Sequence, residues 1–138
     1  MVIDPEVKIV RQIKIAEATV SLRNDSIVHV HYNKNTFLNV ELQLRLLDIL
    51  NEITQEVKSN IIYTADEGVV VTKGARENAL LIEEKSPTNA SAVVADSLAY
   101  RIVANFYMKV NKPKKPFKVV KTFEEGLTWL KSLDQVQN

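Results

Sequence analysis

The sequence predicts a single α/β domain with a mainly parallel, mixed sheet of about five strands flanked by four helices. Three observations support this fold class. A β-hairpin pattern opens the chain, short apolar runs then alternate with segments of helical spacing, and the links between them are short. Strand-helix units joined in this way imply right-handed crossovers and parallel pairing.

Length and composition define the class of protein. At 138 residues and 46% hydrophobic content, the chain fits one domain over residues 1–138, with a core over about 16–133 and loose tails at 1–12 and 134–138. The chain has no cysteine, which excludes disulfides and thiolate metal sites. It has no export-signal pattern at its start and no run of roughly 20 apolar residues. We therefore expect a cytoplasmic, non-membrane-spanning protein.

The N-terminal half is predicted to form a hairpin, a helix and a strand. Alternation over residues 16–22 and 27–32 flanks a turn at 24–26. Asn39 is a typical N-cap for a helix to residue 57, whose apolar stripe consists of Leu42, Leu46, Ile49, Leu50, Ile53 and Val57. Residues 60–65 follow as a short β-branched and aromatic run, which predicts a buried strand.

The C-terminal half repeats this strand-helix pattern. Thr72 is predicted to cap a helix to about residue 85, and residues 90–95 form the next strand. A helix over 99–110 is apolar on most sides, which indicates that it is largely covered. Residues 117–120 are the last strand, and a capping box at Thr122 opens the last helix, whose packing face is Trp129, Leu130 and Leu133.

The order of these elements resembles the SpoIIAA-like fold of STAS domains and CRAL-TRIO-like lipid carriers, from about residue 16 to 133. The pattern is strongest in the C-terminal half. There, residues 93–97, 105–106, 111–113 and 123–130 are similar to a bacterial group of uncharacterised STAS-like proteins. The resemblance implies a regulatory protein-interaction module without a catalytic signature.

The resemblance also places Thr72 where STAS regulators carry a phosphorylated serine. Gly74 matches the glycine of that motif, but Val71 and Lys73 replace its aspartate and second serine. A phosphate on Thr72 would lie favourably at a helix N-terminus beside Lys73 and Arg76. The ordinary interpretation of Thr72 as a helix N-cap is favoured, because such caps are common.

His29 and His31 are the candidate metal ligands, because residues two apart on a strand point to the same face. Zinc usually needs three or four protein ligands, so solvated strand histidines are the favoured interpretation. Only three glycines occur, which leaves no phosphate-binding loop, and we expect no cofactor and no catalytic residues. An enzyme stays the third hypothesis, and a cleft that brings either histidine within hydrogen-bond reach of a carboxylate would favour it.

A basic stretch without acids lies between Ser97 and Phe123. It is a candidate patch for an anionic partner such as a phospholipid headgroup, although a solubilising loop is the favoured interpretation and nucleic acid is not expected at a net charge of +1. The candidate patch residues are Arg101, Lys109, Lys112, Lys114 and Lys115.

The first helix carries a second apolar group, Val40, Leu44 and Leu47, beside its main stripe. A helix that lies on a sheet needs one apolar face. The second face therefore predicts either a homodimer or protein interface, or burial under a neighbouring helix.

These observations favour a noncatalytic, STAS-like interaction module whose protein partner the sequence does not identify. The alternative is a small-ligand or lipid carrier, because the apolar helix over 99–110 is as suited to lining a pocket as to filling a core.

Overall fold

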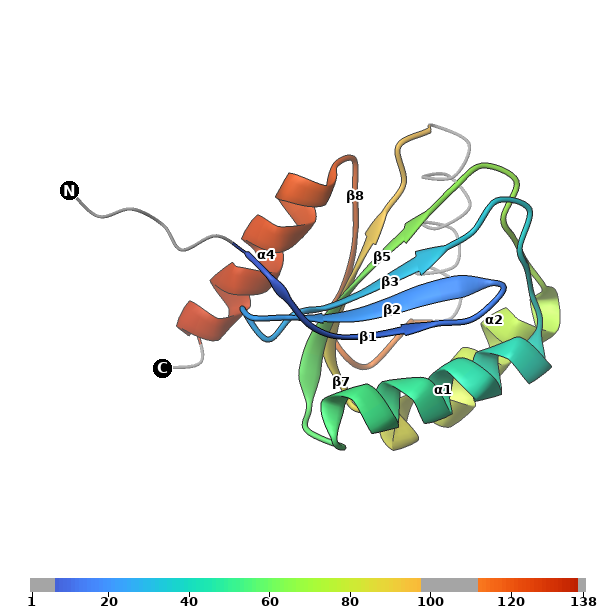
Figure 1. Cartoon of the computed structure of the whole chain (residues 1–138), viewed down its shortest axis with the longest axis horizontal. Coiled ribbons are helices and arrows are strands. Elements are labelled where there is room, and N and C mark those ends of the chain that lie inside the picture. The colour runs from blue at the N-terminus through green and yellow to red at the C-terminus, as the bar shows by residue number, and fades with distance from the viewer. Residues whose placement is uncertain (1–6, 98–111, 137–138) are drawn as a thin grey trace.

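The computed structural model describes residues 7–97 and 112–136, with a central sheet between two layers of helices (Figure 1). The main sheet has six strands in the order β1-β2-β3-β5-β7-β8. The first three pair antiparallel, and β3, β5, β7 and β8 pair parallel, so the mainly parallel α/β class is confirmed. The strands are Ile9–Lys14, Ala18–Arg23, Val28–Tyr32, Ser59–Ala65, Thr88–Val94 and Phe117–Val120.

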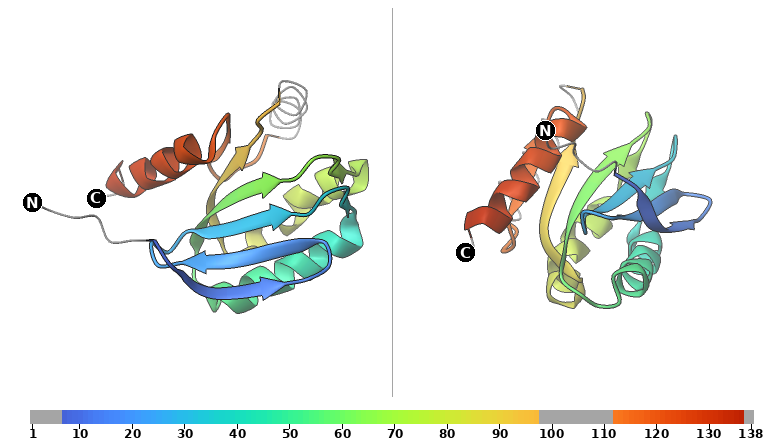
Figure 2. Two further views of the ribbon diagram at one scale, coloured as in Figure 1. Left: turned by 45° about the horizontal axis from the view of Figure 1, so that its top comes forward. Right: turned by 60° about the vertical axis from the view of Figure 1, so that its left-hand side comes forward.

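Helices lie on both faces of this sheet. The helices α1 (Val40–Thr54) and α2 (Lys73–Ile82) lie on one side, and α4 (Phe123–Val136) lies on the other (Figure 2). Each side has its own apolar cluster. Val20, Val30 and Ile61 pack with α1, whereas Ile62 and Ala92 pack with α4.

The strand β1 corrects the predicted loose N-terminal tail. Residues 9–12 belong to β1, which pairs with β2, so the tail prediction is wrong from Ile9 onward. Most side chains of β1 are exposed because it is the edge strand, and an exposed strand lacks the half-buried alternation that marks strands in sequence. The main sheet therefore has six strands where five are predicted.

A second, two-stranded sheet also escapes the sequence pattern. It consists of β4 (Phe37–Leu38) and β6 (Val70–Val71), which pair in parallel. Two residues per strand are too few to show a period of two. In the chain, β4 comes just before α1 and β6 just before α2. The pairing of the two strands therefore holds the N-terminal ends of the two helices together.

The helix α1 begins as predicted, because the Asn39 side chain accepts a hydrogen bond from the Leu42 backbone N–H at 2.9 Å. It ends at Thr54, and Gln55 follows in the left-handed conformation. Val57 lies beyond this end and is 64% exposed, so its inclusion in the apolar stripe is wrong. Leu42, Leu46, Leu50 and Ile53 are buried as predicted.

The helix α2 lies beside α1. Thr72 caps it, since its hydroxyl accepts from the Ala75 N–H at 3.1 Å, and a 3₁₀ turn (Glu83–Lys85) completes the predicted length. The Gln43 side chain on α1 donates to the Ala75 carbonyl at 2.8 Å and accepts from Asn78 at 2.9 Å. These bonds hold α2 against α1.

The helix α4 opens with the predicted capping box. Thr122 Oγ1 accepts from the Glu125 N–H at 3.1 Å, and the Glu125 carboxylate accepts from the Lys121 N–H at 3.2 Å. Leu130 is fully buried, with Trp129 and Leu133 packed around the same cluster, so the predicted face is confirmed. The predicted helix over 99–110 lies outside the described residues, among which three α-helices occur.

Candidate functional site

A cavity of about 820 Å³ lies on the side of the sheet that faces α1 and α2. Residues of the parallel strands β3, β5, β7 and β8 supply one wall, and α1 and α2 supply the other. This volume falls within the roughly 300–1,000 Å³ of small-molecule sites. The strand residues include Val30, Tyr32, Tyr63, Thr64, Ser91 and Val93, and the helix residues include Leu46, Leu47, Leu50, Ala79 and Ile82.

Two tyrosines supply aromatic surface to this cavity. The rings of Tyr32 and Tyr63 stack with centroids 6.4 Å apart and planes 9° apart, because the two residues sit on neighbouring strands with the same facing. Burial, together with the adjacent Tyr63, raises the pKa of Tyr32. Its phenol is therefore neutral at physiological pH and suits an apolar surrounding.

Charged residues also line the cavity, namely the cations Arg76 and Lys115 and the acids Glu83 and Asp96. Lys115 Nζ donates to the backbone carbonyls of Glu83 at 2.7 Å and Ser86 at 3.2 Å. Burial and the neighbouring Lys58 lower the pKa of Lys115. The lining thus combines an apolar interior with a few polar groups, as small-ligand sites do.

The two histidines lie on the opposite face of the sheet. Val28 and Val30 face the α1-side cluster, so His29 and His31 point away from it, as predicted. His31 Nε2 lies 3.1 Å from Asp66 Oδ1, and Thr64 Oγ1 lies 2.6 Å from His29 Nε2 and 2.7 Å from His31 Nδ1. The structure therefore places a histidine within hydrogen-bond reach of a carboxylate.

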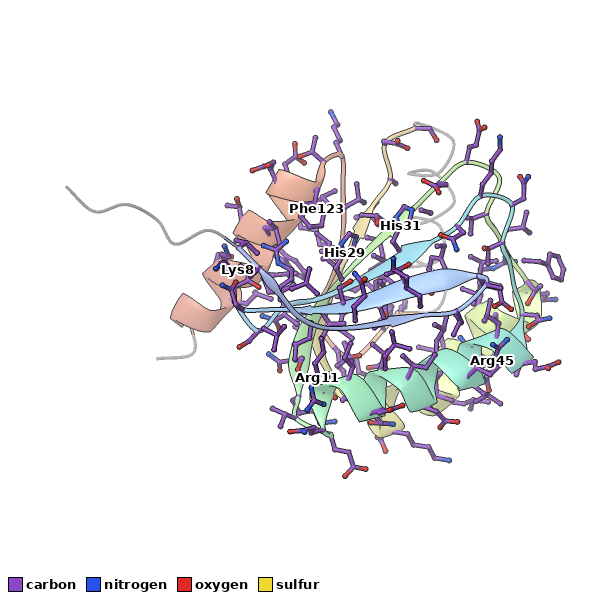
Figure 3. All side chains as sticks on the ribbon, in the orientation of Figure 1. Lys8, Arg11, His29, His31, Arg45 and Phe123 are labelled. Carbon is purple, nitrogen blue, oxygen red and sulfur yellow. The ribbon has the colours of Figure 1, made fainter. Side chains whose placement is uncertain are left out.

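His29 is the more covered of the pair. Its ring lies 5.0 Å from the Phe123 ring at the start of α4 and 6.2 Å from the His31 ring (Figure 3). Burial, then the nearby His31 and Arg23, lower the pKa of His29 to about 4. The ring is neutral at pH 7. Within residues 7–97 and 112–136, no group of three or more acidic or histidine side chains is arranged to hold a metal ion.

Arg23 completes the surroundings of His29. It forms a bidentate pair with Asp25 at 2.8–3.2 Å and lies over the Phe123 ring, 5.4 Å from its centroid. Burial alone would raise the pKa of Asp25, but hydrogen bonds from Arg23 and the Ile27 N–H lower it. The arginine charge is thus neutralised by its own neighbour.

The basic patch is only partly within the described chain. Arg101 and Lys109 lie outside it, while Lys112 and Lys114 are exposed. The backbone N–H groups of Lys114 and Lys115 donate to the Glu83 carboxylate at 3.4 and 2.9 Å. The loop is therefore tied to an acidic residue, which reduces its local positive field.

The predicted interface residues of α1 do not form one exposed face. Leu44 is 43% exposed, whereas Leu47 is 9% exposed and lines the cavity, which agrees with the predicted alternative of burial and not with an interface role for Leu47. Val40 is half-buried. Exposed apolar side chains gather instead on the small sheet, where Phe37 pairs with Val70.

Sequence reasoning does not single out Thr64 or the Tyr32–Tyr63 pair. The alternation within each strand assigns their faces, but the sequence does not show that β3 and β5 are neighbours.

Among the helices of the described segments, none has the length and apolar character needed to cross a membrane.

Comparisons with known proteins give one family. The model described as Domain of unknown function (DUF7793) matches residues 20–134. No curated protein matches the chain, and no solved structure matches it.

Proposed function

The chain belongs to the DUF7793 family, and from the geometry of its cavity we propose that it binds a small apolar ligand. The observation that carries this proposal is the volume of about 820 Å³ between the sheet and its two helices. The cavity is open to solvent on one side, and its size and mainly apolar lining are those of a site that admits a small ligand.

The lining indicates the chemistry of that occupant. Leucines from α1, valines from β3 and β7 and the stacked tyrosines suit an acyl chain or a flat apolar ring. The lining holds two cations, Arg76 and Lys115, which would pair with a carboxylate at one end of a ligand, and two acids, Glu83 and Asp96. This supports a carrier of the CRAL-TRIO-like type.

Two measurements test this proposal: which small molecules the purified protein contains, and whether it binds a fluorescent fatty acid. Native mass spectrometry and lipid extraction of the purified chain should reveal a bound apolar molecule. A dansyl-labelled fatty acid should bind with enhanced fluorescence, and Ala79→Trp, which fills the cavity, should weaken binding at least tenfold. Leu81→Trp is the matched control, because Leu81 is on the same helix, 76% exposed and outside the cavity lining.

Two outcomes would contradict the ligand proposal. One is a chain that carries no small molecule and does not bind the probe. The other is a probe that binds equally to wild type and Ala79→Trp. Either outcome would show that the cavity does not serve as a binding site for an apolar ligand.

A second proposal is a STAS-like protein-interaction module. The hairpin followed by parallel strand-helix units supports it, and so does the exposed apolar pair Phe37 and Val70, at 60% and 52% exposure. We expect wild type to form a dimer in sedimentation equilibrium and Phe37→Ser to weaken it. A wild-type monomer at high concentration would contradict the homodimer.

A further inference from the structure

A continuous row of hydrogen bonds crosses β3 and β5 on the face away from the cavity. It runs from Asp66 through His31 and Thr64 to His29, with distances of 3.1, 2.7 and 2.6 Å. The parallel register sets His31 opposite Thr64 and His29 opposite Ile62, so the threonine hydroxyl reaches both rings. Figure 3 shows the two histidines on the side of the sheet where Phe123 lies.

The hydrogen-bond inventory assigns the protons in this row when both rings are neutral. Asp66 is an acceptor, so His31 carries its hydrogen on Nε2 and leaves Nδ1 free to accept the Thr64 hydroxyl proton. The Thr64 oxygen then accepts a hydrogen from His29 Nε2. Each contact then has one donor and one acceptor. The Thr64 hydroxyl donates to the His31 ring, which the Asp66 carboxylate orients.

This is the arrangement of groups that activates a hydroxyl nucleophile. The base touches the hydroxyl, the carboxylate holds the base, and the second imidazole donates to the same oxygen, where it stabilises negative charge that develops as the proton leaves. The side chains of His31 and Asp66 are 32% and 54% exposed, and Thr64 is half-buried, so the row borders solvent.

We propose that Thr64 is a nucleophilic hydroxyl that takes an acyl group from an activated ester or thioester, with His31 as its base and Asp66 as a positioning residue. Thr64 Oγ1 bonds to the acyl carbon as the bond from that carbon to the leaving oxygen or sulfur breaks. The hydroxyl proton moves to His31 Nδ1 and then to the leaving group. Water attacks the acyl-threonine by the same route and restores the hydroxyl.

The side chains of the row point away from α1 and α2, but Thr64 also belongs to the lining of the cavity, so the proposed activity is tested separately from ligand binding. Its test uses the full chain and p-nitrophenyl acetate. We expect release of p-nitrophenolate, a mass increase of one acetyl group, and a modified peptide that maps to Thr64.

The variants separate the roles. Thr64→Val should abolish labelling of this peptide, and His31→Gln should slow p-nitrophenolate release by about 100-fold or more. Asp66→Asn should also slow it, and Asp66→Glu should restore part of the rate, because the longer carboxylate still accepts from His31. Thr19→Val is the matched control. Thr19 on β2 is the antiparallel partner of His31 on β3 but is not part of the row, so this variant should leave the rate unchanged.

Circular dichroism and thermal unfolding of each variant show whether it is folded. If a folded Thr64→Val releases p-nitrophenolate as fast as wild type, the proposal is wrong. Acetylation confined to lysine side chains would overturn it equally, and so would an Asp66→Glu variant no faster than Asp66→Asn. The probe-binding assay with Ala79→Trp tests the cavity proposal separately, because Ala79 lines the cavity and is not part of the row.

Discussion

At the level of single residues, His29 shows how burial determines a protonation state. The ring packs between Phe123 and Thr64, and the loss of solvent there is the main cause that opposes a positive charge on the ring. The neighbouring His31 and Arg23 add to this effect. The neutral ring can then remain hydrogen-bonded to a hydroxyl beneath the first turn of α4.

His29 should make the stability of the fold depend on pH. The pKa of His29 is lowered from 6.5 to about 4, so between these values the unfolded chain binds a proton that the folded chain does not. The free energy of unfolding should therefore fall as the pH drops from about 6.5 to about 4. Urea unfolding of wild type and His29→Asn across this range measures it.

The variant provides the control for that experiment. His29→Asn should be less stable than wild type at pH 7, because the contact with Thr64 changes. The difference between the two proteins should narrow toward pH 4, since the variant lacks the proton uptake. Parallel curves for the two proteins would show that His29 is not the group responsible.

At the level of elements, α4 approaches the sheet at a glycine. A Cβ atom added at Gly126 would lie 2.6 Å from Ile62 Cδ1, 3.4 Å from Val120 Cγ2 and 3.5 Å from Ala92 Cβ. Ile62 is fully buried, so its side chain has little room to move. The missing side chain thus sets the distance between the helix and strands β5, β7 and β8.

We expect Gly126→Ala to destabilise the protein by about 1–3 kcal/mol, the usual cost of overpacking a core. The matched control is Gly74→Ala in α2, where the added Cβ meets Val40 Cγ2 at an ordinary 3.5 Å. Better helix propensity should make that variant more stable by up to about 1 kcal/mol. Chemical unfolding of both variants measures the difference. An equal effect at the two positions would contradict the close approach of α4.

At the level of the whole molecule, one sheet connects two apolar clusters. Ile61 faces the α1 cluster and its neighbour Ile62 faces the α4 cluster, so β5 is shared by both. Loss of either cluster exposes one side of the same strands. The described part of the chain is therefore expected to unfold as one unit, in agreement with the single domain that the sequence predicts.

Trp129, the single tryptophan, reports on the α4 cluster and provides a test of this unity. Its fluorescence and the far-ultraviolet circular dichroism of the chain should change with the same urea midpoint. An earlier fluorescence transition would show that α4 separates from the sheet before the rest unfolds. That result would contradict a single cooperative domain.

The sequence by itself determined the elements whose signals are local. Asn39, Thr72 and Thr122 mark helix starts because a cap acts on backbone groups two or three residues away. Apolar spacing revealed the buried face of α1 and the hairpin of β2 and β3. Together these predicted the α/β class.

Only the tertiary structure decided which faces meet. It paired the exposed strand β1 with β2, brought Thr64 and Asp66 to His31, and placed Leu47 at the cavity, which decided between the two alternatives for that residue. Periodicity within a segment reports which side of that segment is apolar. It does not show which distant segments contact each other most favourably. Contacts between residues more than 30 positions apart, such as those of Thr64 with His29 and His31, form the candidate sites.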